Sequence, residues 1–318
     1  MTRVRLWFVV VAAVVVACLG LTRYAGAGVP AGAKYAGSKL CMACHKATDS
    51  QMVTGWQESL HSRAFWPVEA TDETHKIVAD FAQSPPFARD QVAYVVGAGW
   101  KQQAFLDKDL KVLPGYWLVA EKRWDQRPAT DARTDCLGCH TSGYDPEKAQ
   151  WKEVGVGCEM CHGPGSTHAG STDKKGTIVR LDSLDPVHQA MVCGRCHAYG
   201  HSKDGRYTFS PTFLPGDDLD ASFVLEQTVP ANAVNSQYNE LRLGGGKHLE
   251  SGTVCTTCHN THLGQAPSLR QQGNALCLQC HAGKLTGPQH SEEILKSAQC
   301  TGCHMPNGSH VFKLGAES

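Results

Sequence analysis

The spacing of the cysteines constrains this chain more than any other feature. Of its 15 cysteines, 14 fall into seven Cys-x-x-Cys-His units, and only Cys18 stands apart. The units are Cys41-Cys44-His45, Cys136-Cys139-His140, Cys158-Cys161-His162, Cys193-Cys196-His197, Cys255-Cys258-His259, Cys277-Cys280-His281 and Cys300-Cys303-His304. The fold of this chain must therefore accommodate seven copies of the same Cys-x-x-Cys-His unit.

Each unit carries two thiols three positions apart and an imidazole directly after the second. The thiols can bond to the two vinyl groups of one porphyrin while the imidazole reaches its iron, which is the c-type haem attachment signature. Zinc ribbons also use Cys-x-x-Cys pairs, and disulfide scaffolds are rich in cysteine. Neither requires a histidine after every pair. We therefore predict seven covalently attached haem c groups.

Composition and pattern indicate the fold class. The chain has 318 residues with 32 glycines and 15 prolines, so we expect mainly α structure with much irregular chain and a core built around seven haems. Helical spacing predicts a helix over residues 47–65, and β-rich stretches predict a small hairpin within residues 91–120. Lys+Arg and Asp+Glu are 30 each, and this balance gives no indication of nucleic-acid binding.

Unit spacing divides the chain. We predict a signal peptide (1–27), a region with the first four units (28–205), a connector (206–245) and a region with the last three units (246–318). The connector is unit-free and contains Pro211, Pro215, Pro230 and the glycine run at 244–246.

The N-terminus predicts export to the periplasm or the cell exterior. Arg3 and Arg5 precede an apolar run of 16 residues, Leu6 to Leu21, and a small-residue cleavage site follows at 25–27. Two alternatives would tether the protein to a membrane. The apolar run could remain as an anchor, although it is short for a span, and Cys18 ends a Val-Val-Ala-Cys sequence that resembles a lipoprotein box.

Nine histidines remain for the sixth iron positions, since imidazole is a usual axial ligand. Their positions near units or turns favour six as distal ligands: His61, His168, His248, His262, His290 and His310. His188 and His201 compete for the seventh place, with His201 preferred, and His75 is left without a role. Methionines are weaker choices because Met42 and Met160 lie inside attachment loops.

Three segments resemble the cytochrome c-554-like multihaem cytochromes. They are residues 49–65, ending Ser-Leu-His-Ser-Arg-Ala-Phe, residues 94–102 (Tyr-Val-Val-Gly-Ala-Gly-Trp-Lys-Gln) and residues 157–168 (Gly-Cys-Glu-Met-Cys-His-Gly-Pro-Gly-Ser-Thr-His). The resemblance covers about residues 36–205. The C-terminal units look like the paired Cys-x-x-Cys-His repeats of respiratory multihaem proteins. The resemblance implies electron transfer in anaerobic or nitrogen-cycle respiration, with stacked, mostly bis-histidine haems. In the c-554 proteins one haem of four is five-coordinate.

Two functions follow, and the first is preferred. If nine spare histidines close every iron, the chain is an electron carrier with other redox proteins as donor and acceptor. If one iron stays open, it is a reductase of a small nitrogen or sulfur oxyanion. The chain has no Cys-x-x-Cys-Lys unit, the lysine-ligated site of related nitrite reductases, and we assign no catalytic residue. Nothing in the residues supports self-assembly.

Overall fold

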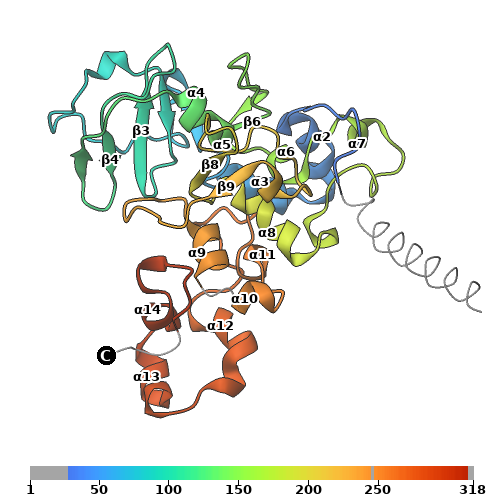
Figure 1. The fold of residues 1–318 in the computed structure, drawn as a ribbon, viewed down its shortest axis with the longest axis vertical. Helices are drawn as coiled ribbons and strands as arrows, with labels where there is room; N and C mark the ends of the chain where they lie inside the picture. The colour runs from blue at the N-terminus through green and yellow to red at the C-terminus, as the bar shows by residue number, and fades with distance from the viewer. Residues whose placement is uncertain (1–27, 245–246, 314–318) are drawn as a thin grey trace, which may run out of the picture.

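The computed structural model describes residues 28–244 and 247–313. The predicted signal peptide, with Cys18, lies outside the described residues. Figure 1 shows an upper lobe that holds the elements from α2 to β9 and a lower lobe that holds α10 to α14, with α9 between them. The two lobes follow the two groups of attachment units along the chain.

The elements are short. The helices are α2 (Ser38–Thr48), α3 (Ser50–Glu58), α4 (Ala132–Asp135), α5 (Leu137–His140), α6 (Glu159–His162), α7 (Ser166–Gly170), α8 (Pro186–Gly194), α9 (Gln237–Leu243), α10 (Lys247–Glu250), α11 (Cys255–Cys258), α12 (Asn274–His281), α13 (Glu292–Ser297) and α14 (Cys300–His304). The strands are β1 (Phe65–Pro67), β2 (Tyr94–Val96), β3 (Gln102–Leu106), β4 (Tyr116–Leu118), β5 (Arg123–Asp125), β6 (Thr141–Ser142), β7 (Glu153–Val154), β8 (Gly200–Ser202) and β9 (Phe223–Leu225).

Attachment units lie on or beside these short helices. The units at α2, α11, α12 and α14 begin within the helix, those at α5 and α6 begin at its N-cap, and the fourth begins near the end of α8. Residues three apart on a helix share one face. This turn therefore presents both thiols of a unit to the same side.

The predicted helix over residues 47–65 is shorter in the structure. Asp49 caps α3 by accepting a hydrogen bond from the Met52 amide at 2.9 Å. At the other end, Ser59 is extended and its hydroxyl and carbonyl accept hydrogen bonds from Ser62. Such local serine bonds compete with helical ones. The helix therefore ends at Glu58, and Phe65 begins a strand.

The unit-free insert between the first two units folds into an antiparallel sheet in the order β1-β2-β3-β4-β5. A hairpin does lie within residues 91–120, but β2 forms it with β3, where Val95 lies opposite Phe105. The stretch at 116–118 is β4, which pairs with β3 and β5 and not with β2. The mainly helical prediction is not confirmed, because this sheet occupies residues 65–125. Strands of three to five residues are too short to show a clear period of two in the sequence.

The sheet is buried on both faces. Trp66, Val95 and Phe105 pack into an aromatic cluster on one face. The alternate residues pack with Cys136 and Leu137 of the second unit on the other: Phe65, Val96, Ala104 and Leu106. Burying a side chain of this size contributes about 1.5–3 kcal/mol. The insert thus packs directly behind the second unit.

The predicted connector is a folded segment. Phe213, Leu219, Phe223 and Tyr238 are buried against Ala190 and Met191, and Cys255 of the fifth unit packs on the same cluster. β9 within this segment pairs with β8. Residues 206–244 therefore link the two groups of units through a hydrophobic core. The last connector residue, Gly245, lies outside the described residues.

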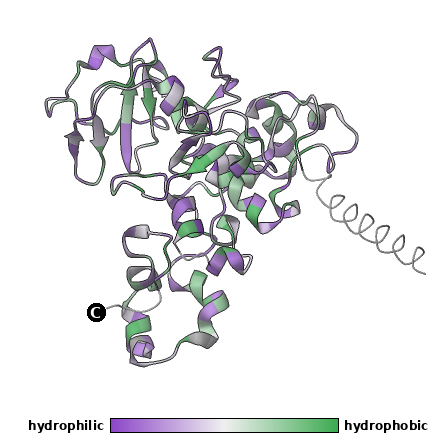
Figure 2. Cartoon of the chain, viewed as in Figure 1, coloured by the Kyte–Doolittle hydropathy of each residue, from purple (hydrophilic) through white to green (hydrophobic). Residues whose placement is uncertain are grey.

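Polar and apolar residues are interleaved along the elements of both lobes (Figure 2). Within residues 28–244 and 247–313, no helix combines the length and apolar character needed to cross a bilayer.

One close backbone approach joins α3 to the lower part of the chain. A Cβ atom on Gly55 would lie 1.9 Å from the His262 carbonyl oxygen. We predict that Gly55→Ala lowers stability by about 1–3 kcal/mol, because the neighbouring backbone must move. The matched variant is Gly170→Ala, where a Cβ would meet nothing within 4 Å. Thermal unfolding of both purified proteins measures this, and equal midpoints would contradict the prediction.

Candidate haem centres

Six pairs of histidine rings face each other, with ring centres 6.0 to 6.2 Å apart. Each pair joins the histidine of one attachment unit to a predicted distal histidine. The pairs are His45–His168, His197–His61, His162–His262, His259–His310, His281–His248 and His304–His290. The structure thus brings six of the seven predicted distal histidines to a unit.

This spacing fits an iron held between two imidazoles. A bond between a metal and an imidazole nitrogen is about 2 Å long, so two such bonds and two half-rings span about 6 Å. In the described part of the chain, His, Cys, Asp and Glu form no cluster of three or more that could hold a metal ion. Each facing pair needs further ligands, and a porphyrin supplies four in one plane.

Hydrogen bonds orient five of the unit histidines. The Nδ1 atoms of His140, His162, His259 and His304 lie 2.8 to 3.0 Å from the carbonyl oxygens of Ala64, Val179, Pro267 and Lys313, and His197 Nδ1 lies 3.3 Å from Gln237 Oε1. With Nδ1 donating to an acceptor, Nε2 is left as the metal-binding nitrogen.

Burial keeps the rings neutral, which is the form that binds a metal. Desolvation, with the nearby His197 and His140, lowers the pKa of His61 to about 4. Desolvation also lowers the pKa values of His162 and His262, which face each other nearly parallel at 6°. These rings need not lose a proton before binding iron near neutral pH.

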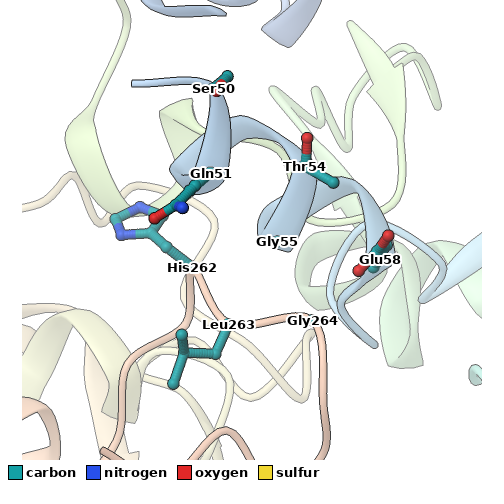
Figure 3. A pocket seen from close by; sticks show the side chains of 8 residues that line it. All are labelled: Ser50, Gln51, Thr54, Gly55, Glu58, His262, Leu263 and Gly264. Atoms are coloured by element: carbon teal, nitrogen blue, oxygen red, sulfur yellow. The ribbon is translucent and has the colours of Figure 1, made fainter. Parts of the chain in front are cut away.

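The His162–His262 pair crosses between the two groups of units. His262 follows the fifth unit but faces the ring of the third. Figure 3 shows the His262–Gly264 loop lying against α3, where it lines a shallow cavity of about 290 Å³ with Ser50, Gln51 and Glu58. The short segment Cys258-His259-Asn260-Thr261-His262 therefore contributes one imidazole to each of two pairs.

His140 differs from the other unit histidines. Among the described residues, which include all 16 histidines, no ring pair joins it to a second imidazole. His61 lies near enough to His140 for an electrostatic interaction, but its ring forms a pair with that of His197.

The structure does not bring His201, the predicted seventh distal ligand, to His140. Its Nδ1 lies 2.8 Å from the Ser202 carbonyl oxygen and its Nε2 lies 3.3 Å from Glu226 Oε1. The β8–β9 pairing, which places Glu226 beside this ring, joins residues too distant in sequence to be foreseen. The Nδ1 atom of His188 lies 2.5 Å from Oδ2 of Asp185. The His75 ring packs on Trp66.

Thiols of different units interact in pairs. The close pairs are Cys41 with Cys158, Cys139 with Cys196, Cys193 with Cys255 and Cys277 with Cys300. Cys161 lies near enough to Cys196, and Cys258 near enough to Cys280, for an electrostatic interaction. All 14 thiols are free of disulfides. Each attachment edge therefore adjoins the edge of another unit.

Comparison with known proteins agrees with this geometry. Residues 100–163 match the family model of cytochrome c554 and c-prime, and residues 247–286 match that of the doubled CXXCH motif. The chain is 27% identical to cytochrome c-554 of Nitrosomonas europaea over 259 residues, which cover 74% of this chain and 88% of that protein. These matches support a place for the chain among the multihaem c-type cytochromes.

Two further relatives extend the comparison. The chain is 26% identical over 161 residues to the multiheme cytochrome MtrA of Shewanella baltica, covering 49% of this chain and 37% of MtrA. The crystal structure of the outer cell wall cytochrome OcwA shares the fold, with a TM-score of 0.67 and 20% identity over 88% of this chain and 80% of OcwA. The likeness to MtrA covers just over a third of that protein, and the likeness to OcwA shows the fold.

The side chain of Arg195 is also placed to interact with a haem. Arg195 lies inside the fourth unit, and its Nη1 atom is buried without a hydrogen-bond partner in the described residues. The guanidinium also acts on the thiols of Cys139, Cys161 and Cys196. A porphyrin propionate is an anion that would satisfy Nη1 where these units meet.

The facing rings lead to a test of the distal positions. We predict that His248→Ala, His262→Ala and His290→Ala each convert one iron to the high-spin state, because each removes one imidazole of a facing pair. The haem count should stay unchanged. Magnetic circular dichroism of the oxidised proteins measures the spin states, with His201→Ala as the control. Parent-like spectra for all three variants would refute these assignments.

Proposed function

We propose that this protein is an exported electron carrier of anaerobic respiration that holds seven covalently attached haems, six of them between two histidines. The observation that carries the proposal is the set of six ring pairs at 6.0 to 6.2 Å. Iron closed by two protein imidazoles cycles between oxidation states without releasing a ligand. Such centres suit transfer rather than substrate binding.

The thiol contacts support an order for the centres in space. The first unit adjoins the third, the third the fourth, the fourth the fifth, the fifth the sixth and the sixth the seventh. The second unit adjoins the fourth through Cys139 and Cys196. Electrons therefore have a continuous route from α2 in the upper lobe to α14 in the lower lobe (Figure 1). The second centre lies on a side branch of that route.

The protein's own groups hold this route in place. The thiols fix the macrocycle edges, the facing imidazoles fix the irons, and carbonyl oxygens such as those of Ala64 and Val179 fix the ring orientations. The bound haems supply the one-electron chemistry. Donor and acceptor are other redox proteins, reached outside the cytoplasm, with a tether through Cys18 or an uncleaved N-terminus as the alternative to a free exported form.

His140 supports a second function at the side branch. The half-buried ring lies within hydrogen-bond distance of the Ala64 carbonyl oxygen, and no second histidine faces it in residues 28–244 and 247–313. An iron bound there on one side would have a position open to a small ligand. A reductase of a small nitrogen or sulfur oxyanion requires such a position, so this remains the alternative function.

Mass spectrometry tests the number of attached groups. We predict that the purified mature protein exceeds its peptide mass by roughly 4 kDa, because all seven units are complete and each binds one haem. Replacing both cysteines of one unit by serine should remove one seventh of that excess. A parent mass corresponding to six haems or fewer would contradict the prediction.

Carbon monoxide binding tests the proposed iron ligation, and the rate of substrate reduction separates the two functions. We predict that the reduced protein binds one carbon monoxide per chain, at the iron on His140, since the other six irons are closed by imidazole. Nitrite and hydroxylamine should be reduced slowly with an artificial donor. Rapid reduction would favour the reductase. Binding at several irons would refute the assignment of two histidine ligands to each of six irons. No binding would mean that another group occupies the sixth position of the iron on His140.

A further inference from the structure

Glu159 is a buried carboxylate inside the third attachment unit, directly after Cys158. Its side chain is 1% exposed. Among the residues that the structure describes, it forms no ion pair with a lysine or arginine. A buried charge of this kind is costly unless hydrogen bonds compensate it.

Three backbone amides supply that compensation. Ala36 N donates to Oε1 at 2.8 Å, Gly37 N donates to Oε2 at 2.7 Å, and Gly165 N donates to Oε1 at 2.7 Å. Hydrogen bonds to an ionised carboxylate are about twice as strong as those between neutral groups. The carboxylate is thus held from three directions.

Each donor belongs to a segment that carries a ligand of the first centre. Ala36 and Gly37 immediately precede α2, which carries Cys41, Cys44 and His45. Gly165 immediately precedes α7, which carries His168, the ring that faces His45 at 6.1 Å. Gly37 and Gly163 adopt φ values of +92° and +77°, which favour glycine and shape these turns.

A parallel contact shows that the first and third units are joined here. Ser38 donates its amide and hydroxyl to the Glu153 carboxylate at 2.9 and 2.7 Å, and the Cys158 amide donates to the Ser38 hydroxyl at 3.0 Å. The thiols of Cys41 and Cys158 interact beside it. Glu159 differs from Glu153 because it also reaches the helix of the distal ring.

We propose that Glu159 is a positioning residue that holds the first and third haem centres together and lowers the reduction potential of both through its fixed negative charge. This inference rests on the proposed function. Charge, burial and hydrogen bonding around a haem set its potential. A carboxylate with no cationic partner stabilises the oxidised, more positive iron over the reduced one. The first and third centres are therefore biased to release electrons toward the fourth.

The test compares Glu159→Gln with Glu159→Asp, and uses the exposed Glu69→Gln as a control for loss of one charge elsewhere. All are measured as intact, haem-loaded proteins by potentiometric titration. We expect Glu159→Gln to move two of the reductive steps to higher potential, while Glu69→Gln leaves all of them unchanged. Glu159→Asp keeps the negative charge, so its potentials should stay near the parent's.

Two results would overturn the proposal. One is a Glu159→Gln protein whose potentials match those of Glu69→Gln. If Glu159→Gln yields no loaded protein, the deciding result is Glu159→Asp, and a rise in its potentials despite the retained charge would be contradictory. These potentials are properties of the loaded chain alone. A negative result therefore leaves the six closed pairs untouched, and failure of the carbon monoxide prediction leaves the role of Glu159 to be judged separately.

Discussion

The facing of two imidazoles in six histidine pairs is the interaction on which the rest of the structure depends. His61 meets His197 and His162 meets His262, so these two pairs join chain segments that are far apart in sequence. Helices of four to eleven residues are not stable alone in water. Metal bonds between such segments, together with thioether links, would supply the long-range cohesion that long helices or large sheets give to other proteins.

The second centre is supported differently from the other six. A five-stranded sheet packs one face on Cys136 and Leu137, and Ala64, directly before β1, accepts from His140. This unit packs on a hydrophobic core and has no second imidazole facing its histidine among the described residues. Such packing without a second histidine is compatible with either a side branch for electrons or a site for a small ligand, and the remaining six centres can serve both.

Features set by local sequence could be predicted, whereas features set by contacts between distant residues could not. Thiol spacing is local, so the attachment residues follow from it directly, and counting spare histidines identified six rings that the structure places beside units. Which ring faces which unit depends on contacts such as Gly55 against His262, which no local pattern encodes. His201 was preferred by position, but β9 brings Glu226 to it. The sheet was underestimated because its strands are only three to five residues long.

Low-temperature electron paramagnetic resonance of the fully oxidised protein tests the six-pair arrangement most directly, because ring orientation controls the low-spin signal. Four pairs lie within 27° of parallel and two are crossed at 68° and 86°. We predict four rhombic low-spin signals, two strongly anisotropic ones and one high-spin iron per chain. Seven low-spin irons, or more than one high-spin iron, would contradict this account.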